Sequence, residues 1–144
     1  MYEELATSFL EVYGDLVEGT VEQSVWVVSD RPLSAEARHA LAVSFENFGY
    51  GTQACGYIIS QQSLGANDLR TIIECVDPII LVVADASTAA LINSAYRANL
   101  PENQTSRLMG RDVVMCSSIE ELLQTPEGKQ RLWALLKKLP AYQK

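Results

Sequence analysis

The sequence predicts an α/β protein, with a mainly parallel sheet of four strands between two layers of helices. Apolar segments of strand length alternate along the chain with segments of helical period, which is typical of this class. The run at residues 79–83, Ile-Ile-Leu-Val-Val, has no polar alternation, as in a parallel strand covered on both faces. The 144 residues are 48% hydrophobic, which fits a single packed domain over residues 1–144.

Two helices and two strands are expected in the first half of the chain. A helix is expected over residues 3–17, because an apolar stripe recurs there at helical spacing. The stripe consists of Leu5, Phe9, Val12 and Leu16. Residues 25–28 are an apolar run of β-branched and aromatic residues that predicts a buried strand, and residues 54–59 predict a second strand. Between them, Ser34 is a suitable N-cap for a helix that ends at Gly49.

The second half continues the alternation. A helix at residues 69–76 leads into the strand at 79–83, and Asp85 or Ser87 caps the next helix. Residues 101–110 are polar and predict a loop, and residues 113–116 predict the last strand.

Two helix starts follow that strand. Ser118-Ile119-Glu120-Glu121 matches a capping box, and Thr125-Pro126 places a capping residue before a proline at the first helical position. Trp26 and Trp133 are expected in the core.

Charge is distributed unevenly. The formal net charge is −7, and residues 1–30 contain seven acids and no Lys or Arg. Residues 97–144 contain eight basic and five acidic residues, a net of +3. Broad nucleic-acid binding is therefore not expected, and nucleic-acid contact would be weak or absent outside a local basic face. The last helix carries four cations: Lys129, Arg131, Lys137 and Lys138. They indicate a solvated helix face, with a phosphate- or acid-binding face as the alternative.

Several protein classes are not expected. The chain starts without a signal-peptide pattern and has no apolar run long enough for a membrane span, which predicts a cytoplasmic protein without membrane contact. Cys55, Cys75 and Cys116 form no C-x-x-C pair, and His39 is the single histidine. We therefore expect no disulfide framework, no metal site and no cofactor.

Polar residues follow each predicted strand, and carboxyl ends of parallel strands meet at one edge of a sheet, where such folds bind ligands. The expected ligand crevice consists of Ser29, Asp30, Pro32, Ser60, Gln61, Asp85, Ser87, Cys116 and Ser117.

Each residue in the crevice that could do chemistry also has a structural explanation, which we favour. Asp30 could position water or a cation, but an acid before Pro32 commonly bonds its own turn. Asp85 could bind a ligand or cap a helix. Cys116 as a nucleophile would need a base, and the chain offers only His39. Capping accounts for Ser117 and Ser118.

The order of motifs resembles the uracil-DNA glycosylase superfamily. Residues 68–92, DLRTIIECVDPIILVVADASTAALI, are similar to that family's helix, apolar strand and small-residue turn. Residues 113–139, VVMCSSIEELLQTPEGKQRLWALLKKL, are similar to its final strand, His-Pro-Ser loop and Trp-containing last helix. The resemblance implies the glycosylase-type three-layer fold.

The catalytic motifs of that family are degraded here. Its first motif stands as Ser29-Asp30-Arg31-Pro32, without the Gly-rich aromatic stretch that stacks on the base. Ser60 stands in place of the asparagine that reads the base, and Cys116-Ser117-Ser118 in place of His-Pro-Ser. Asp30, Ser60, Cys116 and Ser118 are therefore vestigial candidates, and no residue is assigned as catalytic.

Base excision needs a snug pocket, a positioned water and charge stabilisation on the leaving base. With these elements missing together, the resemblance implies an inactive glycosylase-like domain that acts through protein contacts in DNA replication or repair. A similar loss of motifs is seen in the psi subunit of the bacterial DNA polymerase III clamp loader, to which the chain bears a fainter resemblance. The alternatives are a divergent active glycosylase and a flavodoxin- or Rossmann-like small-ligand domain. The oligomeric state stays open.

Overall fold

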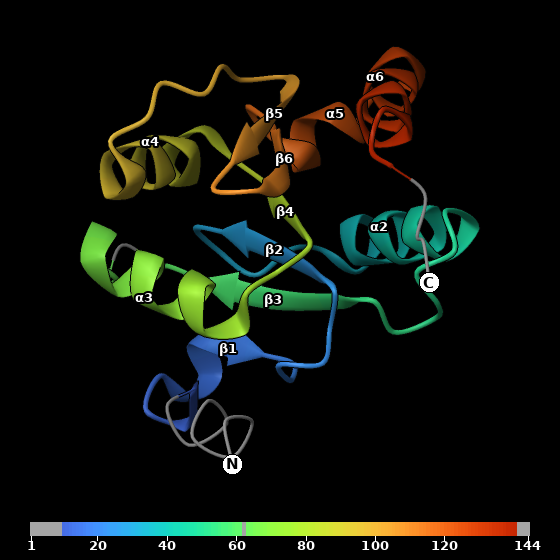
Figure 1. Ribbon diagram of the computed structural model, residues 1–144. Helices are drawn as coiled ribbons and strands as arrows, with labels where there is room; N and C mark the ends of the chain where they lie inside the picture. Colours follow the sequence, from blue (N-terminus) through green and yellow to red (C-terminus); the bar gives the residue numbers. More distant parts are fainter. Residues whose placement is uncertain (1–9, 62, 141–144) are drawn as a thin grey trace.

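The chain forms a six-stranded mixed sheet with helices on both faces, in a computed structural model that describes residues 10–61 and 63–140 (Figure 1). The strand order is β1-β3-β2-β4-β6-β5. The strands are β1 (Val17–Glu18), β2 (Val25–Ser29), β3 (Cys55–Ile59), β4 (Ile80–Val83), β5 (Gln104–Leu108) and β6 (Arg111–Met115). The α/β class is confirmed.

The expected strand number is wrong, because the sheet has two further strands at its edges. The central strands β3, β2, β4 and β6 are parallel, whereas β1 and β5 pair antiparallel with β3 and β6. Strand β5 lies in the segment expected to be a polar loop. Its outer edge has no strand partner in the described sheet, so a polar sequence such as Gln-Thr-Ser-Arg suffices for a strand there.

The first predicted helix ends earlier than its apolar stripe indicates. Residues 3–9 of that prediction lie outside the described residues, and only Leu10 and Glu11 are α-helical in the described part. Gly14 then adopts a φ of +54°, which an α-helix does not tolerate, and a 3₁₀ turn at Gly14–Leu16 leads into β1. The prediction of a helix through residue 17 is therefore wrong.

Two helical layers cover the sheet. Figure 1 shows α2, α5 and α6 on one side and α3 and α4 on the other. The helices are α2 (Ala35–Asn47), α3 (Ala66–Val76), α4 (Ala86–Tyr96), α5 (Ile119–Leu122) and α6 (Pro126–Lys137). Within the described ranges, none of them is long and apolar enough to cross a membrane.

Strand β2 supplies both cores, because successive side chains point to opposite faces of a sheet. Val25 and Val27 pack with α2, α5 and α6, whereas Trp26 and Val28 pack with α3 and α4. Trp26 is fully buried, as expected, and lies directly on Gly56 of β3, where a Cβ atom would come within 2.8 Å of the indole ring. The indole thus requires a glycine on the neighbouring strand.

The other tryptophan departs from its prediction. Trp133 of α6 is 41% exposed and stacks on Phe48, with ring centroids 5.3 Å apart. It therefore lies at the surface between α6 and the end of α2 rather than in the core.

Side-chain caps start four of the helices at the positions that the sequence predicts. Ser34 accepts a hydrogen bond from Ala37 N–H, and Asp85 accepts one from Thr88 N–H. Ser118 accepts a hydrogen bond from Glu121 N–H at the start of α5, and Thr125 accepts one from Gly128 N–H at the start of α6. Three of these helices, α2, α4 and α5, begin just beyond the carboxyl ends of strands, so their caps lie at the edge of the sheet where the crevice is predicted.

Candidate functional site

The carboxyl ends of β2 and β4 form a small hollow that contains much of the predicted crevice. Its volume is about 310 Å³. The lining consists of Asp30, Arg31, Pro32, Leu33, Ala84, Asp85, Ser87, Ser118 and Glu120. In the sheet, β3 lies on one side of β2 and β4 lies on the other, so the order of the strands reverses between β2 and β4. Doubly wound folds bind ligands outside the carboxyl ends of the strands at such a switch point.

Asp85 makes the most structural contacts in this hollow. One carboxylate oxygen accepts hydrogen bonds from Thr88 N–H at 2.9 Å and from the Ser87 hydroxyl at 3.0 Å. The other accepts from Asp30 N–H at 2.9 Å. Half-burial by itself would raise the pKa of Asp85, but the hydrogen bonds from Thr88, Asp30 and Ser87 outweigh it and lower the pKa below its ordinary value. Asp85 is therefore an ionised helix cap that also ties β2 to α4.

The residues after β2 and β3 are joined mainly through their backbones. Ser60 N–H donates to Ser29 C=O at 2.9 Å, and Gln61 N–H donates to Asp30 C=O at 2.8 Å. The Ser29 hydroxyl donates to Arg31 C=O at 2.7 Å, and the Ser60 hydroxyl reaches the Asp30 carboxylate at 3.4 Å. Ser29 and Ser60 are both buried, so these polar groups hold the loops together.

The segment after β6 does not present a reactive group to the hollow. Cys116 is fully buried in the core beneath α5 and α6, and burial raises the pKa of its thiol to about 12. His39 is exposed on α2, and no hydrogen bond joins it to Cys116. Ser117 C=O accepts from Ala86 N–H at 2.9 Å, and Ser118 caps α5. The strand pattern thus predicts that Cys116, Ser117 and Ser118 lie near the end of β6. It does not show that the Cys116 side chain is used for core packing and the Ser118 side chain for helix capping.

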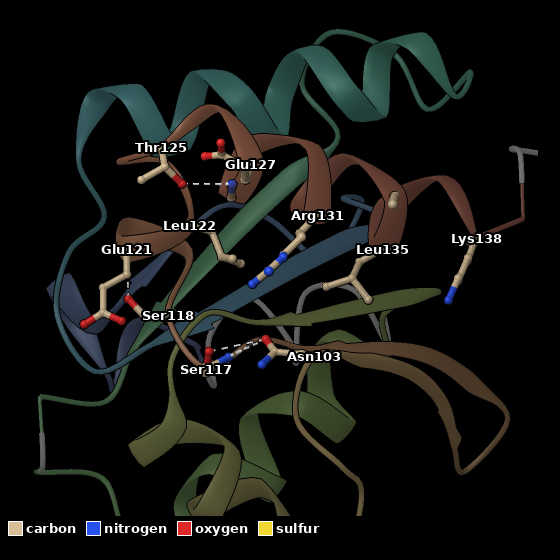
Figure 2. A pocket seen from close by; sticks show the side chains of 12 residues that line it. Asn103, Ser117, Ser118, Glu121, Leu122, Thr125, Glu127, Arg131, Leu135 and Lys138 are labelled. Atoms are coloured by element: carbon tan, nitrogen blue, oxygen red, sulfur yellow. Dashed lines mark hydrogen bonds between the residues drawn. The ribbon is translucent and has the colours of Figure 1, made fainter.

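A larger cavity lies beside this hollow, between α5, α6 and the start of β5 (Figure 2). Its volume is about 560 Å³. It is lined by Asn103, Ser117, Ser118, Glu121, Leu122, Thr125, Glu127, Gly128, Arg131, Ala134, Leu135 and Lys138. Ser117 and Ser118 belong to the residues expected near the strand ends, and Arg131 and Lys138 to the cations for which an acid-binding face is the alternative. Asn103 is not foreseen, since it lies in the loop before an edge strand that the sequence does not predict.

A third hollow is a groove between α2 and α6, of about 350 Å³. Apolar side chains dominate it, including Val43, Leu132 and the exposed face of Trp133. Lys129 and Glu36 form an ion pair across it, at 3.7 Å.

Among residues 10–61 and 63–140, no group of three or more His, Cys, Asp and Glu side chains is placed to hold a metal ion. The strand-end hollow contains three carboxylates. Asp85 caps α4, Glu120 accepts hydrogen bonds from the N–H and hydroxyl of Ser34, and Asp30 accepts one from the Ser60 hydroxyl at 3.4 Å.

Comparison with protein-family models and with curated proteins finds no match for this chain.

Proposed function

We propose that this protein is a non-catalytic domain of the uracil-DNA glycosylase type that acts through contacts with other proteins, in DNA replication or repair. The three-layer arrangement around four central parallel strands is compatible with that proposal. The resemblance of residues 68–92 and 113–139 to that superfamily supplies the context of replication or repair.

The observation that carries the proposal is the use of the strand-end side chains as structural groups. The Asp85 carboxylate accepts three hydrogen bonds from its own chain, and Cys116 lies under the helices. A glycosylase needs groups at this edge that face a flipped base and stabilise its departure. Asp30 alone supplies neither a stacking wall nor a donor for the leaving base.

The groove between α2 and α6 supports the part of the proposal that concerns protein contacts. Trp133 presents part of its indole to solvent beside Val43, which is 39% exposed. Partly exposed tryptophan in an apolar depression is the type of residue that dominates the energetics of protein interfaces. The overall charge of −7 favours protein partners over nucleic acid.

A uracil-excision assay on single-stranded DNA tests the absence of catalysis. We expect no release of uracil above the level of an Asp30→Ala variant, with a glycosylase of known activity as the positive control. Release by the wild-type chain that Asp30→Ala abolishes would show a divergent active enzyme instead.

Affinity capture with a matched pair of surface variants tests the protein contact. Trp133→Glu changes the groove between α2 and α6, whereas Met109→Glu changes an apolar side chain that is still more exposed, in the turn between β5 and β6. We expect a defined partner to bind the wild type and Met109→Glu but not Trp133→Glu. A partner that binds all three equally would place the contact elsewhere, and a chain that captures no protein would contradict the proposal.

A further inference from the structure

We propose that the cavity between α5, α6 and the start of β5 is a binding site for a small organic anion, with a carboxylate or phosphate group on an apolar body. This inference does not rest on the proposed function, because the cavity is separate from the groove between α2 and α6. At about 560 Å³ the cavity has the size of known small-molecule sites.

Two cations on the cavity wall have no counterion among the described residues. Arg131 of α6 and Lys138, the residue that follows α6, line the cavity, and no salt bridge or hydrogen bond joins either side chain to residues 10–61 or 63–140. By contrast, Arg38, Arg107, Arg111 and Lys129 all pair with carboxylates. Arg131 and Lys138 are therefore the side chains of this wall that can take up a negatively charged group without breaking an existing pair.

The opposite side of the cavity is polar and fixed in place. The Asn103 side-chain oxygen accepts hydrogen bonds from Ser117 N–H at 3.1 Å and from the Ser117 hydroxyl at 3.3 Å. This arrangement leaves the amide nitrogen of Asn103 as a donor. Figure 2 shows the Arg131 side chain extending from α6 toward this Asn103–Ser117 pair. A carboxylate or phosphate held there would meet a guanidinium from one side and an amide from the other.

The acidic residues of the cavity set the direction of the ligand. Figure 2 shows Glu121 and Glu127 at the end of the cavity near Thr125, while Lys138 lies at the opposite end. Carboxylates at one end repel an anion and cations at the other attract it, so the charged group of the ligand lies on the side of Arg131 and Lys138.

Apolar side chains provide a surface for the rest of the ligand. Leu122 and Leu135 line the cavity, as does Ala134 of α6. A lining with leucine side chains beside charged and polar ones fits an amphiphilic ligand better than a bare ion. Inorganic phosphate alone would leave the leucine surface uncovered.

Titration of the ¹⁵N-labelled full chain by NMR tests the proposal, with phenyl phosphate and benzoate as probes. We expect saturable shifts that centre on Asn103, Ser117 and Arg131, and tighter binding than for inorganic phosphate or phenol. Arg131→Gln and Lys138→Gln should each weaken binding by about threefold to tenfold. Ala134→Phe, which fills the cavity from an exposed helix position, should abolish it.

Lys137→Gln is the matched control, because Lys137 is an exposed cation of the same helix that does not line the cavity. It should leave the affinity unchanged. An equal loss of affinity in Lys137→Gln and Arg131→Gln would show that the probes are attracted only to the surface charge of the helix, and this would overturn the proposal. The same conclusion follows if neither aromatic anion binds, if they bind no tighter than inorganic phosphate, or if the shifts centre on Asp30 and Asp85. Thermal unfolding of each variant, followed by circular dichroism, verifies that the fold is retained.

Discussion

At the scale of single residues, the polar side chains that follow the strands act mainly as helix caps and loop ties. Asp85 shows this most clearly, since its carboxylate starts α4 and also holds the backbone N–H of Asp30. A carboxylate in this position contributes stability only while it is ionised.

Asp85→Asn should lower the free energy of unfolding by about 1–2 kcal/mol at neutral pH, because an amide keeps one acceptor but loses the charge and the second one. The pKa of Asp85 lies below its ordinary value of 3.8, so its contribution is full above that value and is lost as the pH falls through the lower pKa of the folded state. The difference in unfolding free energy between wild type and variant, measured with urea, should therefore narrow as the pH falls from neutral to below 3.8. An equal difference in unfolding free energy at neutral pH and below pH 3.8 would show that ionisation of Asp85 does not contribute to stability.

Cys116 should be unreactive in the folded protein. Burial covers the thiol and raises its pKa to about 12, and only a thiolate reacts with an alkylating agent. We expect iodoacetamide at mildly alkaline pH to label Cys116 in denaturant and not in buffer, as read by peptide mass spectrometry. Labelling at comparable rates in both conditions would mean that the thiol is accessible and that a nucleophilic role has to be considered again.

The sequence predicts residue roles well where they depend on neighbours in the chain. The caps Ser34, Ser118 and Thr125 are correct because a cap bonds a backbone N–H only three residues away. The exposure of Trp133 depends instead on how far α2 extends over α6, which no local pattern encodes.

At the scale of secondary-structure elements, the strongly apolar strands and the capped helices are where the sequence predicts them. The errors lie at the edges of the sheet. Strand β5 is polar because one of its edges is open, and the helix before β1 ends early because of the backbone at Gly14. An edge strand does not need the apolar pattern that identifies a central strand.

The corner between α5 and α6 depends on Gly128. A Cβ atom at this position would lie 2.0 Å from the carbonyl oxygen of Leu122, so the two helices would have to separate. Gly128→Ala should therefore destabilise the protein by about 1–3 kcal/mol, measured by chemical unfolding.

Gly65→Ala is the control for that substitution. A Cβ atom at residue 65 meets only the Asp68 side chain at 3.7 Å, an ordinary contact, and the backbone there is extended. We expect a change in stability close to zero. A loss as large as that of Gly128→Ala would attribute the effect to glycine replacement in general rather than to the contact with Leu122.

At the scale of the whole molecule, the sheet separates two apolar cores. Leu41 and Phe45 of α2 lie in one, and Ile72 and Ile73 of α3 lie in the other. The strands β2 and β4 contribute side chains to both, so loss of packing on one face removes support from the other.

Shortening a buried side chain on either face of the sheet should therefore destabilise the whole domain, which should still unfold in one transition. We expect Leu41→Ala and Ile72→Ala each to reduce the free energy of unfolding by about 2–5 kcal/mol, with an unchanged denaturant dependence. Urea curves followed by tryptophan fluorescence and by circular dichroism should coincide. Separate transitions, or a reduced slope in one variant, would indicate that the two layers unfold independently.

The candidate site could be predicted only in part from the sequence. Parallel topology correctly brings Asp30, Ser60 and Asp85 to one edge of the sheet. The sequence offers Arg131 as a possible anion-binding cation but does not predict the larger cavity, which also needs Asn103 from the loop before the unpredicted strand β5. Residues so far apart in sequence meet only once the tertiary fold is known.

The position of β2 also has a consequence for the protein while it is being synthesised. Strand β2 leaves the ribosome before both of the strands that flank it, β3 and β4, and its residues are all buried in the finished fold. Until Ile80–Val83 have emerged, the Val-Trp-Val-Val segment has an unpaired edge, and a nascent chain with such an edge is prone to aggregation. The rate at which the ribosome delivers residues 30–83 therefore sets how long this apolar segment waits for its second partner strand.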